Sequence, residues 1–434
     1  MMTTVTEIPV RAQAAAPAEA TMKLRYGINE IQNWRNFALG PGRQSIWERC
    51  REAGTSVVRI LVYDQGTPDP AAEWPAFAAC LRAVQSLGAV PMITFSRFPA
   101  PFDDAGAIGG FAARCEDIVG RAVEEWGGEA ARDWYWCIGH EPNSEWSGAR
   151  LSFEQYRRIY EEVAPRIRAR LAPHLGSRKA RIGGPAANGF LPFWMDWIWR
   201  FVQEIDNSLI GFASWHCYGD WREPGAWGAP TEEPLFRALL MSRTREYESR
   251  AAAVSRLLRD GGILNVCGEL NAHSHHEGRV SGPYNQTVFG AAYYASALLH
   301  LLRGGADMEL LRSGTDDGGT YGMLDSQGRP TPVFFAKSLC ARHLRRGDRL
   351  WFPPASSDGL LAVVARAEDG RCGALLVHQN EGPRTFPAPD WTAALGHPLR
   401  LLKVDRSAPY GPLETPFDGA IAFDGYGVAA LTNQ

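Results

Sequence analysis

Short apolar runs alternate with helix-forming segments over most of this chain of 434 residues. Most runs lack the strict apolar–polar alternation of half-exposed strands, which is typical of strands covered on both faces of a parallel sheet. Eight such strands separated by helices indicate a (β/α)8 barrel, and a dinucleotide-binding fold is disfavoured because no GxGxxG follows a strand. The predicted strands are Leu24–Asn29, Ser56–Val62, Ala89–Phe95, Trp134–His140, Arg181–Ala186, Gly211–His216, Ile263–Gly268 and Asp307–Ser313.

Helical patterns fill the intervals between these strands. The fourth begins with the capping box Ser152-Phe-Glu-Gln155, a signature of a helix N-terminus. Several others end at a glycine, the residue that most readily adopts the left-handed C-terminal cap. The remaining helices are expected near Ile46–Ala53, Ala76–Leu87, Phe111–Trp126, Trp194–Ile205, Leu235–Asp260, Thr287–Arg303 and Val333–Leu344.

The alternation ends near residue 345. Short apolar runs separated by turn residues follow, with no helical pattern between them, which favours a small antiparallel β module packed against the barrel. The predicted fold is therefore α/β, a (β/α)8 TIM barrel with a C-terminal antiparallel β module. We divide the chain into a disordered tail at 1–22, the (β/α)8 barrel at 23–345 and a β-sandwich-like accessory module at 346–434. The strands expected in the module are Gly359–Ala365, Arg371–His378, Leu399–Lys403 and Gly419–Phe423.

Composition excludes several classes of protein. A formal net charge of −3 gives no basic footprint for nucleic acid. No apolar run approaches the ~18 residues of a membrane span, and the first 22 residues lack the apolar core of a signal peptide, so we expect a cytoplasmic protein. The eight cysteines show no CxxC spacing, and we interpret them as reduced structural residues.

Two of the predicted strands lead into a carboxylate. The run Trp134-Tyr-Trp-Cys-Ile-Gly-His precedes Glu141, and the run Ile263-Leu-Asn-Val-Cys-Gly precedes Glu269. Side chains at the C-terminal ends of barrel strands face a shared mouth, so two acids far apart in sequence can meet there. Cleavage of a glycosidic bond needs two such groups, and the pattern therefore points to chemistry on sugars.

Further motifs occur at other strand ends. They are Gly183-Gly-Pro185, Ser214-Trp-His216-Cys-Tyr218-Gly, and Tyr321-Gly-Met-Leu-Asp-Ser-Gln-Gly-Arg-Pro-Thr-Pro332. Together with Gly-His-Glu141-Pro-Asn and Gly268-Glu269-Leu-Asn271, their order resembles that of a clan A retaining glycoside hydrolase. The chain is most similar to glycoside hydrolase family 39, which includes β-xylosidases, α-iduronidases and bacterial enzymes acting on exopolysaccharides. The resemblance covers roughly residues 24–345, and the β module also matches the family layout.

The resemblance implies that Glu141 is the acid/base and Glu269 the nucleophile. In a retaining enzyme the two carboxyl groups stand about 5–5.5 Å apart. At that separation we expect their repulsion to raise the pKa of one, so that it stays protonated near neutral pH and serves as the acid.

The chain departs from the family pattern at two positions near the expected −1 sugar. His140 stands where the family has an asparagine that contacts the sugar 2-hydroxyl, and the imidazole is larger and titratable. Ser313-Gly-Thr-Asp316 stands where the family commonly has tryptophan at the eighth strand. Both departures argue against simply transferring a xylosidase specificity to this chain.

Further residues are candidates for substrate contacts. Arg59 could orient Glu269, while His216 and Tyr218 follow the sixth strand, where the family places groups that contact the nucleophile or the sugar. Among 15 tryptophans, several fall on predicted loops at the mouth and could stack on sugar rings, namely Trp34, Trp146, Trp221 and Trp227. His273, His275 and His276 form a polar loop rather than a metal site, and we predict neither metal nor cofactor.

We therefore predict a retaining glycoside hydrolase that cleaves an oligo- or polysaccharide by a two-glutamate double displacement. The alternative is a carbohydrate-binding or catalytically impaired relative. The expected partner is a carbohydrate, with no nucleic acid and no membrane. The sugar, the linkage, endo or exo action and the oligomeric state stay open.

Overall fold

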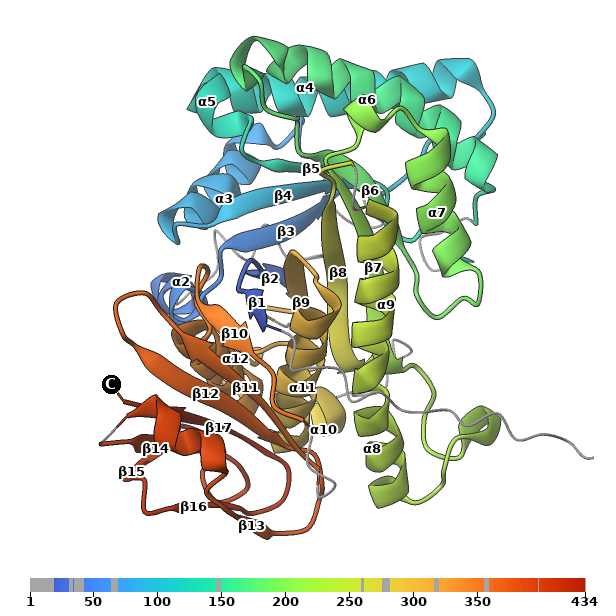
Figure 1. The fold of residues 1–434 in the computed structure, drawn as a ribbon. Helices are drawn as coiled ribbons and strands as arrows, with labels where there is room; N and C mark the ends of the chain where they lie inside the picture. Colours follow the sequence, from blue (N-terminus) through green and yellow to red (C-terminus); the bar gives the residue numbers. More distant parts are fainter. Residues whose placement is uncertain are drawn as a thin grey trace, which may run out of the picture.

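The computed structural model describes residues 19–30, 34, 43–63, 69–145, 150–258, 261–274, 282–315, 320–354, 359–396 and 398–433. Within these residues, eight parallel strands pair side by side and close into a barrel that helices surround (Figure 1). The predicted α/β fold, a TIM barrel with a C-terminal antiparallel β module, is confirmed. The barrel strands are β2 (Arg25–Asn29), β3 (Val57–Val62), β4 (Val90–Phe95), β5 (Tyr135–Ile138), β6 (Ile182–Ala187), β7 (Phe212–Asp220), β8 (Leu264–His273) and β9 (Met308–Arg312).

Strands β7 and β8 are longer than predicted. The sequence predicts that they end at His216 and Gly268, but they stay paired as far as Asp220 and His273. Their last residues therefore rise above the barrel rim and form one wall of the mouth.

The outer helices lie close to their predicted positions. The largest difference is at Leu235–Asp260, where Arg243 separates two helices and its side chain donates to the carbonyl oxygen of Gly219 at 2.7 Å. The described helices are α2 (Arg43–Glu52), α3 (Trp74–Ser86), α4 (Ala105–Trp126), α5 (Gly128–Ala131), α6 (Phe153–Leu175), α7 (Trp194–Glu204), α8 (Glu233–Ser242), α9 (Thr244–Leu258), α10 (Gly282–Asn285), α11 (Val288–Gly304) and α12 (Pro332–His343).

Side-chain caps explain where two of these helices start. Helix α4 begins well before the predicted Phe111, because the Asp104 carboxylate accepts a hydrogen bond from the N–H of Ala107. Helix α6 begins with the predicted capping box, in which the Ser152 hydroxyl and the Gln155 side chain each accept from the other residue's backbone N–H. An N-cap of this kind typically stabilises a helix by about 1 kcal/mol.

The C-terminal module is built on an antiparallel sheet of seven described strands in the order β1-β10-β11-β12-β17-β14-β15. A two-stranded sheet, β13-β16, completes it, and η4 (Asp390–Leu395) adds a short 3-10 helix that was not predicted. Four strands lie where the sequence predicts them, and β10, β13, β15 and β17 are additional. The bounds are β10 (Arg349–Trp351), β11 (Leu360–Arg366), β12 (Cys372–His378), β13 (Arg384–Pro387), β14 (Arg400–Val404), β15 (Leu413–Pro416), β16 (Ala420–Phe423) and β17 (Gly427–Thr432).

The prediction of a disordered tail is wrong for its last residues. Glu19–Thr21 were assigned to a disordered segment at 1–22, but they form β1, which pairs antiparallel with β10 at the edge of the module's sheet. Met22 is buried. The pairing depends on residues more than 300 positions away, so no local pattern could reveal it. Residues 1–18 lie outside the described part of the chain.

The module's sheet separates two apolar cores. Alternate residues of each strand point to opposite faces, and one face packs on α11 and α12 of the barrel (Figure 1). The other face packs against β13, β16 and η4. On the barrel side lie Leu361, Val363, Leu375, Val377, Val428 and Ala430, and on the outer side lie Ala362, Leu376, Ala429 and Leu431 together with Phe386 and Phe423.

The described residues bear on two further expectations. None of the helices in the described ranges has the length and apolar character needed to cross a bilayer. All eight cysteines are buried and unpaired within those ranges, and burial raises the pKa of thiols such as Cys137, to about 11.

Candidate active site

Glu141 and Glu269 lie at the C-terminal mouth of the barrel. Glu141 follows β5, and its backbone N–H donates to the carbonyl oxygen of Ala186 in β6 at 2.9 Å. Its φ of 48° lies in the left-handed region, which non-glycine residues seldom adopt and which is enriched at functional sites. The backbone is thus held in an unusual conformation at the residue that carries the carboxylate.

A register shift determines the direction of Glu269. Gly268 has no opposite residue in β7, because His216 pairs with Glu269 and the residue before His216 pairs with Cys267. A Cβ at Gly268 would lie 2.4 Å from Ser214 Oγ, so a larger residue does not fit there. Bulges of this kind re-aim side chains next to active sites, and here the bulge places Glu269 beside His216.

The two carboxylates lie close together. Nδ1 of His216 is 2.8 Å from Oε1 of Glu141 and 3.8 Å from Oε2 of Glu269, so these two oxygens are at most 6.6 Å apart, the sum of the two distances. This limit reaches only the lower edge of the ~6.5–9.5 Å separation of inverting glycosidases and includes the ~5–5.5 Å of retaining ones. The exposed fractions are 8% for Glu141 and 1% for Glu269, so Glu141 keeps slightly more access to solvent.

Three side chains hold Glu269 in place. Arg59 donates to Oε1 at 2.7 Å, and the Tyr218 hydroxyl donates to Oε2 at 2.5 Å. A second guanidinium, that of Arg312, lies 3.7 Å from Oε2 and over the ring of Tyr321. Both carboxylate oxygens of Glu269 therefore face positive charge or a donor.

These neighbours keep Glu269 ionised. Burial raises its pKa, but the imidazoles of His216 and His140 and the guanidinium groups of Arg312 and Arg59 lower it by more, so the pKa lies well below its ordinary value. Arginine stays charged at any working pH, so its part of the effect persists at neutral pH. A buried, ionised carboxylate is what a nucleophile requires.

Glu141 has a different set of partners. His216 Nδ1 lies 2.8 Å from Oε1, while the Asn188 amide donates to Oε2 at 2.9 Å and the Ser144 hydroxyl at 3.3 Å. Asn188 is itself fixed, because its backbone N–H donates to Asn143 Oδ1 at 2.8 Å. None of these partners is a permanent cation, in contrast to those of Glu269.

The expected rise in the pKa of the acid is not found. Burial raises the pKa of Glu141, but the hydrogen bond and the charge of His216 outweigh it, and the net shift is downward. Repulsion from Glu269 acts in the expected direction and is smaller than these effects. The downward shift favours the ionised form of Glu141, so the repulsion expected from the sequence does not by itself keep this carboxyl protonated.

His140 is a neutral hydrogen-bond donor. Nη2 of Arg59 lies 3.1 Å from His140 Nδ1, and because arginine can only donate, Nδ1 must accept and the proton lies on Nε2. Burial lowers the pKa of His140 to about 3, with the Glu269 charge opposing and the Arg59 charge reinforcing this shift. The side chain is 15% exposed, so an N–H donor remains available at the edge of the mouth.

Arg59 connects most of the barrel strands around the site. Besides its contacts to Glu269 and His140, it donates to Thr94 Oγ1 and Asn29 Oδ1, each at 3.1 Å. Asn29 in turn donates to the carbonyl oxygens of Gly268 and Leu310 at 3.0 and 3.1 Å. A single buried guanidinium thus couples β2, β3, β4, β5 and β8.

An open cavity of about 600 Å³ lies beside these residues. Tyr218 lines it and also bonds Glu269, so this tyrosine connects the cavity with the carboxylates, which do not themselves line it. Trp221, 39% exposed, and Trp227, 82% exposed, contribute aromatic faces. Arg222 is held there by the buried carboxylate of Asp220 at 2.6 Å.

Among the described residues, Trp34 and His273 do not reach the site. Trp34 is 1% exposed and packs edge-on against Phe77, so it belongs to the core and its predicted sugar contact is wrong. His273 is buried, with Nε2 2.7 Å from the carbonyl oxygen of Arg222. Trp146, His275, His276 and Asp316 lie outside the described residues.

The fold matches solved structures of glycosidases over nearly the whole chain. A glucosidase from Croceicoccus marinus is 17% identical, with a TM-score of 0.65 over 96% of this chain and 97% of that one. A GH39 β-xylosidase from Caulobacter crescentus is 15% identical (TM-score 0.63; 97% and 98%), and a family 51 α-L-arabinofuranosidase from Bifidobacterium longum is 16% identical (TM-score 0.65; 96% and 97%). The chain has the fold of these glycosidases. No protein-family model and no curated protein matches the sequence.

The predicted resemblance to clan A glycoside hydrolases is thus confirmed at the level of the fold. Within this glycosidase fold, three site residues were missed by sequence reasoning, namely Asn29, Asn188 and Arg312. Each stands at or directly after the C-terminal end of a barrel strand. The strand-end rule that identified Glu141 and Glu269 also applies to them, but their residue types carry no comparable chemical signal.

The glycosidase fold also brings together three groups that could serve as metal ligands. Ligand atoms of His140, His216 and Glu269 lie within 4.8 Å of one another. Arg59 donates to Nδ1 of His140 and to Oε1 of Glu269, so a cation at this point would meet a guanidinium instead of free lone pairs. The arrangement favours an ion-pair network over metal binding.

Proposed function

We propose that the protein is a retaining glycoside hydrolase, most similar to family 39 of clan A, that acts on an oligo- or polysaccharide. Glu269 is the nucleophile and Glu141 the acid/base. The observation that carries the proposal is the position of His216 Nδ1, which lies 2.8 Å from one carboxylate and 3.8 Å from the other at the mouth of the barrel.

The first step forms a glycosyl-enzyme. A carboxylate oxygen of Glu269, kept ionised by Arg59 and Arg312, attacks the anomeric carbon as the bond to the leaving oxygen breaks. Glu141, which enters this step in its protonated form, passes its proton to that oxygen. Tyr218 keeps the attacking carboxylate in one orientation, which reduces the entropic part of the barrier.

In the second step a water molecule attacks the anomeric carbon. Glu141, now ionised, removes a proton from the water, and the bond from the sugar to Glu269 breaks. Two inversions give net retention of configuration. No group other than these side chains and water is needed for the atoms and charges to balance.

The sugar in the −1 position is expected to meet His140. An Nε2–H donor can bond the 2-hydroxyl in place of the amide that the family uses, and this contact strengthens as the transition state gains oxocarbenium character. The solved structures above are named for different sugars, and one fold supports several specificities. The sugar must therefore be identified by a screen of aryl glycosides and of plant and bacterial polysaccharides.

Trapping the intermediate tests the assignment of roles. A 2-fluoro glycoside of a sugar that the screen identifies should label Glu269, which peptide mass spectrometry would detect. Glu269→Ala should abolish labelling, and azide should restore turnover with inverted product. Glu141→Ala should slow substrates with poor leaving groups far more than activated aryl glycosides, because only the former need protonation.

The opposite pattern would exchange the two roles. Binding of a polysaccharide without turnover by the native chain would favour the carbohydrate-binding alternative instead. Glu154→Ala, which removes an exposed glutamate on α6 paired with Arg200, is a matched control and should leave labelling and turnover unchanged.

A further inference from the structure

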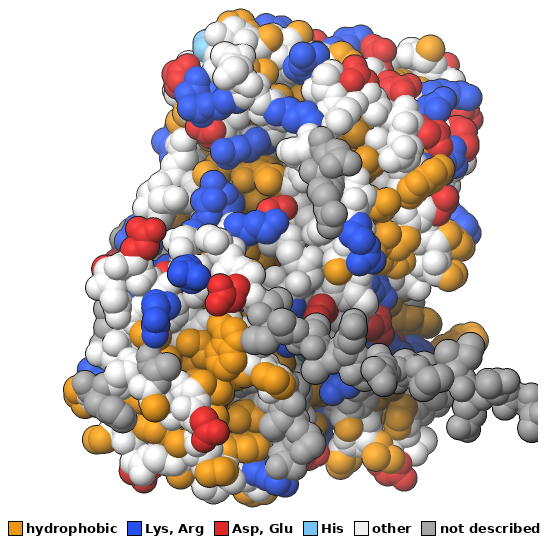
Figure 2. Space-filling model, in the orientation of Figure 1, with side chains coloured by type: hydrophobic (Ala, Val, Ile, Leu, Met, Phe, Trp, Pro, Cys, Tyr) orange, Lys and Arg blue, Asp and Glu red, His pale blue; other side chains and the backbone are white. Residues whose placement is uncertain are grey.

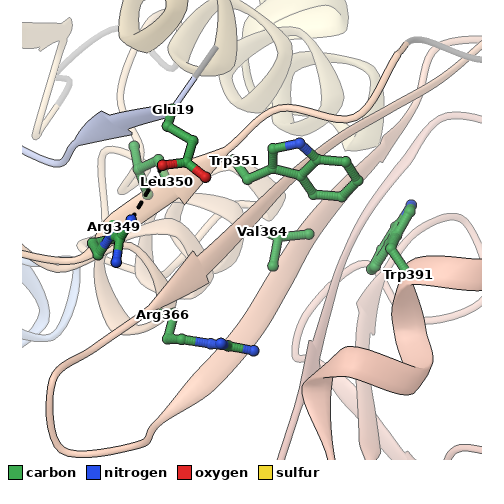
Figure 3. A pocket seen from close by; sticks show the side chains of 7 residues that line it. All are labelled: Glu19, Arg349, Leu350, Trp351, Val364, Arg366 and Trp391. Atoms are coloured by element: carbon green, nitrogen blue, oxygen red, sulfur yellow. Dashed lines mark hydrogen bonds and ion pairs between the residues drawn. The ribbon is translucent and has the colours of Figure 1, made fainter. Parts of the chain in front are cut away.

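The C-terminal module has an aromatic cavity that the proposed hydrolysis does not use. Its volume is about 240 Å³, and its apolar lining includes Trp351 of β10, Val364 of β11 and Trp391 of η4. The other lining residues are Glu19, Arg349, Leu350 and Arg366. Figure 3 shows Trp351 above Val364 and Trp391 to its right, with Arg349 beside Glu19 at the left and Arg366 below.

The register of the sheet explains how this surface arises. Trp351 pairs with Glu19 on one side and with Val364 on the other, and Arg349 pairs with Arg366. Directly paired residues project from the same face of a sheet, so the apolar and the charged rows lie next to each other. Leu350, between Arg349 and Trp351 in β10, belongs to the barrel-side core and is also one of the residues that line the cavity.

The outer face of the sheet is covered only in part. Val364 and Trp391 pack against the core that the sheet forms with β13 and β16. Trp351 lies in β10, which is one strand closer to the edge of the sheet than β11. It packs neither in that core nor against it, and its side chain is partly exposed. Figure 2 shows hydrophobic side chains gathered on this face of the module, with basic and acidic side chains above them.

The chemistry of the lining fits a sugar ring. The C–H face of a pyranose is apolar and flat, and it stacks on an indole, while the hydroxyl groups at its edge bond charged side chains. Here the indole faces adjoin the exposed ion pair of Arg349 and Glu19, at 3.2 Å. A cavity of this size is suited to one or two rings, whereas a stable protein partner would need a contact of about 1,000 Å² or more.

We propose that Trp351, Val364 and Trp391 form an accessory binding site for a segment of a glycan chain. The site holds the polysaccharide on the module while another part of the same chain reaches the barrel mouth. This inference rests on the proposed function in one respect, the choice of a glycan as the ligand. Stacking of a sugar on the tryptophans does not itself require hydrolysis.

Binding by the full chain tests this site. The probes are soluble xylan, arabinan, β-glucan and a bacterial exopolysaccharide, each cast separately into a native gel, and retardation of the protein band is measured. We expect at least one probe to retard the native chain and Trp351→Ala to reduce that retardation at least tenfold in apparent affinity. Trp351→Phe, which keeps a ring, should preserve part of it.

Trp199→Ala is the matched control, because Trp199 is 47% exposed on α7 of the barrel, away from the module. It should retain full binding. Trp351→Ala should keep the native melting temperature and its kcat/KM on a small aryl glycoside, which engages only the barrel. Loss of binding together with unchanged aryl glycoside hydrolysis identifies an accessory site.

Three results would overturn the proposal. They are native-like retardation of Trp351→Ala, no retardation of the native chain by any probe, and a native dimer that Trp351→Ala converts to a monomer, which would make the surface an interface between copies. If the native chain binds through Trp351 but hydrolyses nothing in the panel, the accessory site stands and the proposed hydrolysis fails.

Discussion

Nη2 of Arg59 lies 3.1 Å from Nδ1 of His140, and this contact determines which imidazole nitrogen carries the proton. The same guanidinium binds Glu269 through Nη1 at 2.7 Å. One buried arginine thus prepares two groups, a carboxylate that stays charged and an imidazole that stays neutral. The imidazole of His140 therefore has a partner that makes it a hydrogen-bond donor through Nε2.

Removal of His140 should slow the reaction. His140→Ala removes the Nε2–H donor at the −1 sugar, and we expect kcat/KM on the natural substrate to fall at least about tenfold, or ~1.4 kcal/mol. His140→Asn should not exceed the native rate, because the smaller side chain leaves a gap and loses the contact with Arg59. Steady-state kinetics of both variants check this. An unchanged kcat/KM for His140→Ala would show that the His140 side chain contributes only to packing.

The same residue should affect stability at low pH. The folded-state pKa of about 3 lies below the ordinary value of about 6.5, so between these values the unfolded chain binds a proton that the folded chain does not. Stability is then complete above pH 6.5 and falls as the pH is lowered. Melting temperatures measured from pH 7.5 to 4.5 should decline less for His140→Asn than for the native chain. Equal slopes would contradict a buried neutral imidazole.

Arg59→Met should expose the role of the guanidinium. It leaves Glu269 buried with one fewer cation, so the pKa of Glu269 should rise and the acid limb of the kcat/KM profile should move to higher pH. Breaking a buried pair typically costs about 3–5 kcal/mol, which unfolding in urea would register. Arg59→Lys keeps the charge, so its acid limb should stay near the native one even if turnover falls.

Two tryptophans predicted to contact sugar should now behave differently. Trp34→Ala empties a core position and should destabilise the protein by about 3–5 kcal/mol without selective loss of substrate affinity. Trp221→Ala, at a half-exposed position beside Tyr218, should raise KM for longer substrates while stability changes by less than about 0.5 kcal/mol. Urea unfolding and kinetics on substrates of increasing length distinguish these effects. If the Trp34→Ala variant were as stable as the native protein and had a raised KM, Trp34 would contact substrate and its assignment to the core would be wrong.

The predictions from the sequence were correct where a local pattern of residues determines the geometry by itself. Buried strands that alternate with helices predict the barrel, and the rule that strand ends share one mouth brings Glu141 and Glu269 together. Features that depend on two distant segments could not be predicted. The bulge at Gly268 depends on the register with β7, and the burial of Trp34 depends on where Phe77 of α3 lies.

The predicted direction of the pKa shift of Glu141 was wrong for a similar reason. The sequence indicates a second carboxylate nearby, which raises the pKa, but it does not show that Nδ1 of His216 lies 2.8 Å away and lowers it. A pKa is set by the sum of burial, charges and hydrogen bonds. Only one of these three contributions could be inferred from the order of motifs.

The pairing of Glu19–Thr21 with Arg349–Trp351 has a mechanical consequence. The chain enters and leaves the barrel through neighbouring strands of one sheet, so a force that pulls residue 19 away from residue 433 first loads the short β1–β10 ladder. That ladder should give way before any barrel strand separates. In an optical-tweezers trace of the full chain, we expect a small early extension from the release of β1, followed by a much larger one when the barrel opens.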